Sequence, residues 1–147
     1  MLVPALLMNL ALVAAGQPPP TAEELLARLD LTSFPNSTGP LHLPAPGTPA
    51  AAGFDEAWSE AGGWAYRSRE GGEPGDGGGW RIGLRILEVN ADSTAVCFRD
   101  VAHTGGSYSV QTALILTPTG DGYSARKGPA RADCPEWRRR SEAAPSG

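Results

Sequence analysis

Three residues of the types used in acid–base–nucleophile catalysis lie close together in the sequence. They lie at one predicted turn between two strands, His-Thr-Gly-Gly: His103 begins the turn, Asp100 precedes it and Ser107 follows it. Such a set needs a donor that stabilises the oxyanion as well as the three side chains. No G-x-S-x-G run surrounds the serine, and Asp, Ser and Gly are ordinary residues of tight turns. We interpret the cluster as turn chemistry and assign no catalytic residue.

A second group of side chains follows from the alternation of the predicted strands. Five arginines fall on positions that we expect to share the face opposite the apolar one: Arg67, Arg69, Arg81, Arg85 and Arg99. Guanidinium groups on a rigid sheet suit phosphate, sulfate or carboxylate ligands. The simpler interpretation is that one face of an antiparallel sheet must be polar. These five arginines are the candidate ligand-binding residues.

The sequence offers no recognisable metal, cofactor or nucleic-acid motif. His42 and His103 lie far apart, and the two cysteines are expected to pair with each other. The glycines of 75–79 precede a strand instead of joining a strand to a helix, so they do not form a phosphate-binding loop. We therefore predict no metal, no cofactor and no nucleic-acid partner.

The N-terminal segment predicts export from the cell. Residues 1–16, MLVPALLMNLALVAAG, are uncharged and mostly apolar, and they end in small side chains. They are too short for a permanent membrane helix but are typical of a signal peptide, although the usual positive start is missing. Arginine outnumbers lysine strongly among the basic residues, which favours a GC-rich bacterial genome. We expect a periplasmic or secreted protein with no stable membrane insertion after removal of the leader.

Two cysteines, Cys97 and Cys134, are the only ones in the chain. In an exported protein an even pair predicts one disulfide. Such a bond would bring the C-terminal segment, with Trp137 and its arginines, across the arginine-bearing face. That segment would then form a partly covered second layer or one wall of a basic groove.

The N-terminal arm, residues 17–53, is rich in proline. Thr21 and Glu24 form a capping-box pattern, which predicts a short helix over 21–30 with one apolar side. A crossing loop follows as far as residue 53, because proline and glycine exclude regular elements there. Residues 54–61 are expected to form two helical turns, with Trp58 as a buried anchor.

Alternating segments then predict strands over 63–69, 80–89, 94–101, 107–117 and 123–125, with a bulge near Leu87. Short turns between them favour an antiparallel meander of four or five strands. The fold class is α+β and mostly β, with the helix packed on the apolar face of the 54–135 domain; residues 136–147 are expected to be a polar tail without regular structure. The apolar face is expected to carry Trp64, Tyr66, Trp80, Ile82, Leu84, Ile86, Val96, Phe98, Val110, Leu114 and Leu116.

Two functions remain open at this point. The first is a non-catalytic binding or interaction protein, whose partner is an anionic surface polymer or an acidic protein. The alternative is a small enzyme or ligand carrier with a pocket between the helix and a concave sheet. That pocket would need converging polar groups, and Asp100, Thr112 and Tyr66 are the inward candidates by alternation.

Overall fold

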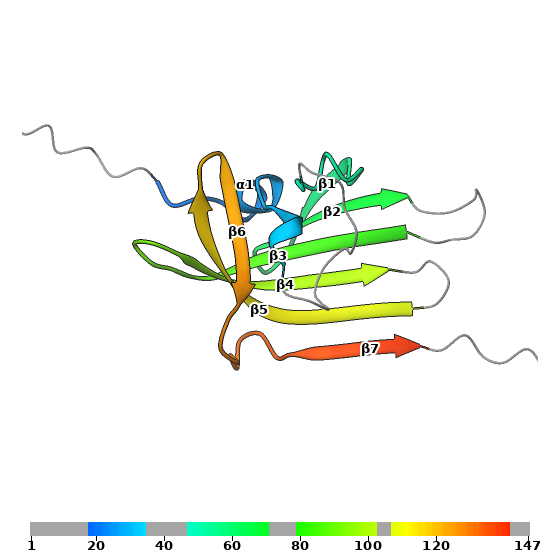
Figure 1. Cartoon of the computed structure of the whole chain (residues 1–147). Coiled ribbons are helices and arrows are strands. Elements are labelled where there is room, and N and C mark those ends of the chain that lie inside the picture. The colour runs from blue at the N-terminus through cyan, green and yellow to red at the C-terminus, as the bar shows by residue number, and fades with distance from the viewer. Residues whose placement is uncertain (1–17, 35–46, 71–78, 103–106, 142–147) are drawn as a thin grey trace, which may run out of the picture.

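The computed structural model describes residues 18–34, 47–70, 79–102 and 107–141 (Figure 1). The predicted leader, most of the crossing loop, the glycine-rich loop at 71–78 and His103 lie outside the described residues.

Antiparallel β-structure dominates the described chain. Seven strands form one sheet in the order β1-β2-β3-β4-β5-β6, and β7 pairs with β5. Their bounds are β1 Glu56–Glu60, β2 Trp64–Glu70, β3 Gly79–Val89, β4 Thr94–Ala102, β5 Ser107–Thr119, β6 Gly122–Lys127 and β7 Trp137–Ser141. The long strand β5 pairs with β7 along its first part and with β6 along its last part. Figure 1 shows this last part turning with β6 away from the direction of the other strands.

The prediction of an antiparallel meander is therefore confirmed, but the expected four or five strands did not include β1 and β7. The segment expected to be helical forms β1 instead, because Gly62 and Gly63 have φ of 86° and 82° and close a tight hairpin with β2. β7 lies within the segment expected to lack regular structure. It pairs with β5 from Gln111 to Ser107, and the Gln111 side chain donates to the Pro135 carbonyl at 2.9 Å just before the strand.

The N-terminal helix α1 spans Ala22–Ala27 and has the predicted capping box between Thr21 and Glu24. It is shorter than the expected 21–30 because the chain that follows pairs with β6. The Arg28 carbonyl accepts from the Tyr123 amide at 3.0 Å, and the Asp30 amide donates to the Tyr123 carbonyl at 2.8 Å. Asp30 then caps a 3₁₀ turn, η1, over Leu31–Ser33.

These N-terminal elements cover one face of the sheet, which we call the helix face. Its core is closed by fully buried side chains from both layers, including Leu25 and Leu26 of α1, Phe54, and Phe98 of β4. In Figure 1, α1 lies beside the β5–β6 hairpin, which curls over the same side of the sheet. The helix expected to cover the apolar strands therefore does so, together with the hairpin.

The opposite face, called the disulfide face below, holds a second and smaller core. Cys97 of β4 and Cys134 form the predicted disulfide, with a sequence separation of 37. Both cysteines are buried against the side chains of Trp64, Tyr66 and Ala113. The bond fastens the segment that leads into β7 to the middle of the sheet.

The alternation of β2 is the reverse of the prediction. Ala65 pairs with Leu84 and contributes to the helix-face core, whereas Trp64 and Tyr66 lie on the disulfide face. The alternation of β3, β4 and β5 agrees with the prediction, as does the bulge between Ile86 and Glu88.

We predict that replacing both cysteines, Cys97→Ala with Cys134→Ala, lowers the free energy of unfolding by about 3–4 kcal/mol, because the bond restrains a loop of some 37 residues in the unfolded chain. Urea unfolding of the oxidised protein and the variant measures the loss. An unchanged midpoint and slope would contradict the structural role of the bond.

Candidate functional site

One row of residues crosses the disulfide face from edge to edge. Its members lie directly opposite one another in successive strand pairs: Trp58, Tyr66, Gly83, Arg99, Gln111 and Trp137. Cross-strand partners point to the same side of a sheet, so the row brings aromatic, guanidinium and amide groups together. Such a row is the most chemically varied part of the described surface.

Arg99 is the centre of this row. Its Nε donates to Gln111 Oε1 at 2.7 Å, and one terminal nitrogen donates to the Tyr66 hydroxyl at 2.9 Å. The guanidinium lies 3.9 Å from the ring centroid of Trp64 and 5.4 Å from that of Trp137. With two donors committed and two rings against it, Arg99 holds the row together as well as supplying charge.

Arg85 and Arg81 flank Arg99 on the neighbouring strand β3. Arg85 lies 5.3 Å from the Trp64 centroid and donates to the carbonyl of Asp133, next to the disulfide. Arg81 is exposed and lies 5.7 Å from the Tyr66 centroid. Both guanidinium groups therefore lie beside aromatic rings. The Nε of Arg85 is buried and has no hydrogen-bond partner among the described residues, whereas Arg81 is exposed.

Arg139 of β7 belongs to the same face, although the sequence did not single it out. It is exposed and lies opposite Ser109, in the row that also contains Val101 and Arg81. Its placement depends on β7 being a strand. Three successive arginines at 138–140 were the available signal, but alternation could not be applied to a segment expected to be irregular.

The five arginines predicted to share a face are divided between the two faces. Arg81, Arg85 and Arg99 lie together on the disulfide face as expected. Arg67 and Arg69 lie on the helix face, where they donate to the carbonyls of Phe54 and Ala52 at 3.1 Å each. Their guanidinium groups cap backbone carbonyls and cover the edge of the helix-face core. The difference follows directly from the reversed alternation of β2.

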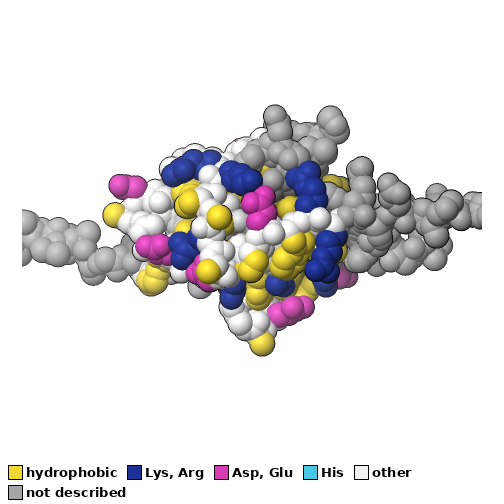
Figure 2. Space-filling view, turned by 90° about the horizontal axis from the view of Figure 1, so that it is seen from below, with side chains coloured by type: hydrophobic (Ala, Val, Ile, Leu, Met, Phe, Trp, Pro, Cys, Tyr) yellow, Lys and Arg dark blue, Asp and Glu magenta, His cyan; other side chains and the backbone are white. Residues whose placement is uncertain are grey.

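The arginines of the disulfide face form no ion pair with a carboxylate of the described chain, although Arg131 and, to a lesser extent, the charge of Arg85 lower the pKa of Asp133. The ion pairs among described residues are Lys127–Glu136, Arg131–Glu88 and Arg131–Asp133. None of them includes Arg81, Arg85, Arg99 or Arg139. Figure 2, which views the molecule from below Figure 1, shows Lys and Arg side chains beside hydrophobic ones. The disulfide face thus combines aromatic side chains with arginines that form no ion pair within the described chain.

Gly83 is required at the centre of the row because the ring of Tyr66 lies over it. A Cβ at this position would collide with Cε1 and Cδ1 of Tyr66. The ring is also stacked between Trp58 at 5.5 Å and Trp64 at 5.7 Å, so it has no room to turn aside. The glycine and the ring together bring the Tyr66 hydroxyl to Arg99.

We predict that Gly83→Ala lowers the free energy of unfolding by about 1–3 kcal/mol, as expected for overpacking. Gly79→Ala is the matched control in the same strand, because its Cβ would make an ordinary contact at 3.9 Å with the Arg69 carbonyl. Thermal and urea unfolding compare the two. Equal effects in both variants would show that the ring of Tyr66 can move away.

Asp100, the acid of the predicted turn cluster, is buried on the helix face. Its Oδ1 accepts a hydrogen bond from Trp80 Nε1, while Oδ2 has no hydrogen-bond partner among the described residues. Burial raises the pKa of Asp100 from its ordinary value of 3.8 to about 6, although the Trp80 bond opposes this shift. His103 and the side chain of Ser107 lie outside the described residues.

Asp100 makes stability depend on pH in a window of its own. The folded chain holds the Asp100 proton more tightly than the unfolded chain does. Its contribution to the free energy of unfolding is therefore full below pH 4 and is lost as the pH rises through 6. Between these limits the free energy of unfolding of the wild type should fall by roughly 3 kcal/mol, because the pKa moves from 3.8 to about 6, and we predict that Asp100→Asn abolishes this fall. Urea unfolding from pH 4 to pH 7 measures it. Glu23 and Asp133, whose pKa values are lowered by Ser59 and Arg131, act below this window. Parallel pH profiles for variant and wild type would contradict the prediction.

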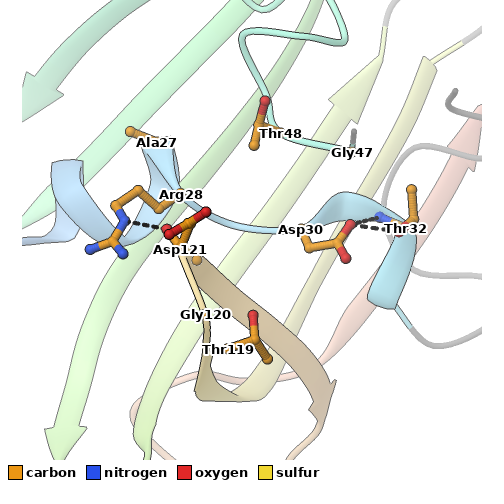
Figure 3. Close-up of a pocket in the computed structure, with 10 residues that line it drawn as sticks. Ala27, Arg28, Asp30, Thr32, Gly47, Thr48, Thr119, Gly120 and Asp121 are labelled. Atoms are coloured by element: carbon orange, nitrogen blue, oxygen red, sulfur yellow. Dashed lines mark hydrogen bonds between the residues drawn. The ribbon is translucent and has the colours of Figure 1, made fainter. Parts of the chain in front are cut away.

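Buried side chains of α1 and the sheet, including Leu25, Leu26 and Phe98, pack against one another in the helix-face core. Thr112 is buried on the helix face and Tyr66 on the disulfide face, so the polar residues expected to converge with Asp100 do not all meet. Two open clefts occur elsewhere. One of about 480 Å³ lies between Arg28, Asp30, Thr48 and the β5–β6 turn (Figure 3). The other, of about 440 Å³, lies between α1 and the β1–β2 turn.

Figure 3 shows that two charged side chains of the larger cleft, Arg28 and Asp30, bond to other residues of its lining. Arg28 donates to the carbonyl of Asp121 at 2.7 Å, and the Asp30 carboxylate accepts from the amide of Thr32 at 2.9 Å. The described residues contain no group of three or more His, Cys, Asp or Glu side chains suited to a metal ion. They also contain no helix long and apolar enough to cross a membrane.

Comparison with protein-family models, curated proteins and solved structures gives no match for this chain.

Proposed function

We propose that this protein is an exported, non-catalytic binding protein whose disulfide face takes an anionic surface polymer. The observation that carries the proposal is the arrangement of Arg81, Arg85 and Arg99 on one face, without an ion pair to any described carboxylate. A polymer with carboxylate or sulfate groups matches forks spaced across neighbouring strands.

The net charge of the chain is negative, so any binding of a polyanion must depend on one positively charged region of its surface. The formal net charge is −4, so the molecule as a whole repels a polyanion. Binding must therefore come from a local concentration of positive charge, and the disulfide face supplies one. The proposal thus concerns one face of the protein and not its bulk charge.

The aromatic side chains of the face add a second type of contact. Trp58 and Trp137 are half-buried and lie at the two ends of the row. Their rings offer flat apolar surface beside charged groups, which suits a polymer made of sugar rings carrying acidic groups. An acidic polysaccharide is accordingly the polymer class that the face favours over an acidic protein.

The predicted leader and the disulfide support an extracellular or periplasmic location for this binding. A buried disulfide is typical of oxidising compartments. The location is part of the proposal, because residues 1–16 lie outside the described chain.

We predict that the protein is retained on immobilised heparin at low ionic strength and elutes as salt rises, because exposed charges are screened. Arg81→Gln with Arg85→Gln should lower the salt needed for elution, since two guanidinium groups leave the face. Arg28→Gln with Lys127→Gln is the control of equal charge change away from this face, because exposed Arg28 follows α1 and exposed Lys127 lies opposite Leu114 of the helix-face core. Circular dichroism checks that both variants are folded.

Three results bear on the proposal. Loss of retention in the first variant alone supports it. Equal losses in both variants would reduce the interaction to bulk charge, and failure of the wild-type protein to bind at low salt would overturn it.

A further inference from the structure

Three strands of the described sheet, β1, β6 and β7, pair with one other strand only. The segment 28–30 bonds to the other side of β6, whereas no described segment pairs with the outer side of β1 or β7. β1 pairs with β2, and β7 pairs with β5. An exposed strand edge presents unpaired amides and carbonyls to any chain that can lie beside it. In Figure 1, β1 and β7 lie at opposite ends of the sheet.

These two edges carry opposite charge. Asp55, Glu56 and Glu60 are exposed at β1, and none of them forms an ion pair with a described residue. β7 has the sequence WRRRS, and its Arg139 is exposed. Charged residues on edge strands usually prevent association because identical edges repel. Edges of opposite sign do the reverse.

The geometry of the sheet also favours a join between these edges. Five antiparallel pairings separate β1 from β7, so the two strands run antiparallel to each other. A second copy moved sideways along the sheet, without rotation, therefore brings its β1 antiparallel to β7 of the first copy. The disulfide face of each copy then lies on the same side of the joined sheet. Along the row, hydrogen-bonded and non-hydrogen-bonded residue pairs alternate from one strand pair to the next. After five pairings, the backbone amide and carbonyl of Trp58 and those of Trp137 therefore either both point to the free edge or both point away from it. Two residues that lie opposite each other in a new antiparallel pair must match in this way.

We propose that a second copy of this chain pairs its β1 with β7, so that the sheet continues from one molecule to the next. The register that extends the row of the disulfide face places Trp58 of one copy opposite Trp137 of the other. The same register places Glu56 opposite Arg139, because both residues point to the disulfide face. One aromatic pair and one opposite-charge pair then fix the register of the join.

The join uses two different surfaces, so it does not close on itself in a two-fold dimer. Each added copy leaves one β1 and one β7 free, and association continues with concentration. This proposal rests on the strand edges and not on Arg81 or Arg85, so a failure of polyanion binding would leave it standing; Arg139 is the residue that the two proposals share.

Sedimentation of the purified full-length protein over a wide concentration range tests the proposal. We expect the weight-average mass to rise beyond that of a dimer at low ionic strength and to fall with salt. Glu56→Arg and Arg139→Glu should each weaken association about tenfold, because each places like charges opposite one another. Asp92→Arg and Arg126→Glu change the charge equally away from the Glu56–Arg139 contact and should leave association unchanged.

Mixing the two edge variants gives the sharpest result. The arginine introduced at position 56 of one variant then faces the glutamate introduced at position 139 of the other. The second junction in the mixture is the native pair, so association should return. The double variant Glu56→Arg with Arg139→Glu should also associate, and circular dichroism checks the folding of each protein. A monomer at all concentrations, a dimer that does not grow, or a mixture no larger than its separate components would overturn the proposal.

Discussion

The pairing of Ala65 with Leu84 is the constraint on which the arrangement of both faces depends. Side chains alternate along a strand, so this one register decides the direction of every side chain in β2. It places the small side chain of Ala65 under α1, where the helix approaches the sheet, and sends Trp64 and Tyr66 to the disulfide face. A shift of one residue would exchange the two sets and bury tryptophan beneath the helix.

The same register explains why arginine serves two purposes in this fold. On the helix face, Arg67 and Arg69 donate to the carbonyls of Phe54 and Ala52, and the Arg69 guanidinium lies 5.7 Å from the centroid of the Phe54 ring. On the disulfide face, Arg85 and Arg99 lie against aromatic rings and donate to acceptors of the protein, whereas Arg81 is exposed. These arginines resemble a binding surface because none of them forms an ion pair within the described chain.

Local patterns in the sequence predicted much of this structure, and tertiary pairing decided the rest. The capping box at Thr21, the bulge near Leu87 and the alternation of β3, β4 and β5 depend on neighbouring residues, and each is found. The alternation of β2 was not predictable in this way, because both of its faces carry residues able to cover a core: aromatic rings on one and long arginines on the other. β1 becomes a strand through its hairpin to β2, and β7 is held to β5 by backbone pairing and by the nearby disulfide. The candidate site was therefore predicted in part. The sequence placed Arg81, Arg85 and Arg99 on one face and brought Trp137 to it through the disulfide, but Trp58 and Trp137 lie on strands that only the folded sheet defines.

Arg139 links the two proposed activities of this surface. It lies in the row of Arg81 on the disulfide face, and it is also the residue that meets Glu56 of a second copy. A polyanion that draws on Arg139 competes with Glu56 for the same guanidinium, whereas a joined sheet repeats Arg81, Arg85 and Arg99 along its length. A short anion would therefore oppose association. A polymer long enough to contact several copies would favour it, because the repeated sites act together even when one arginine in each copy is already paired.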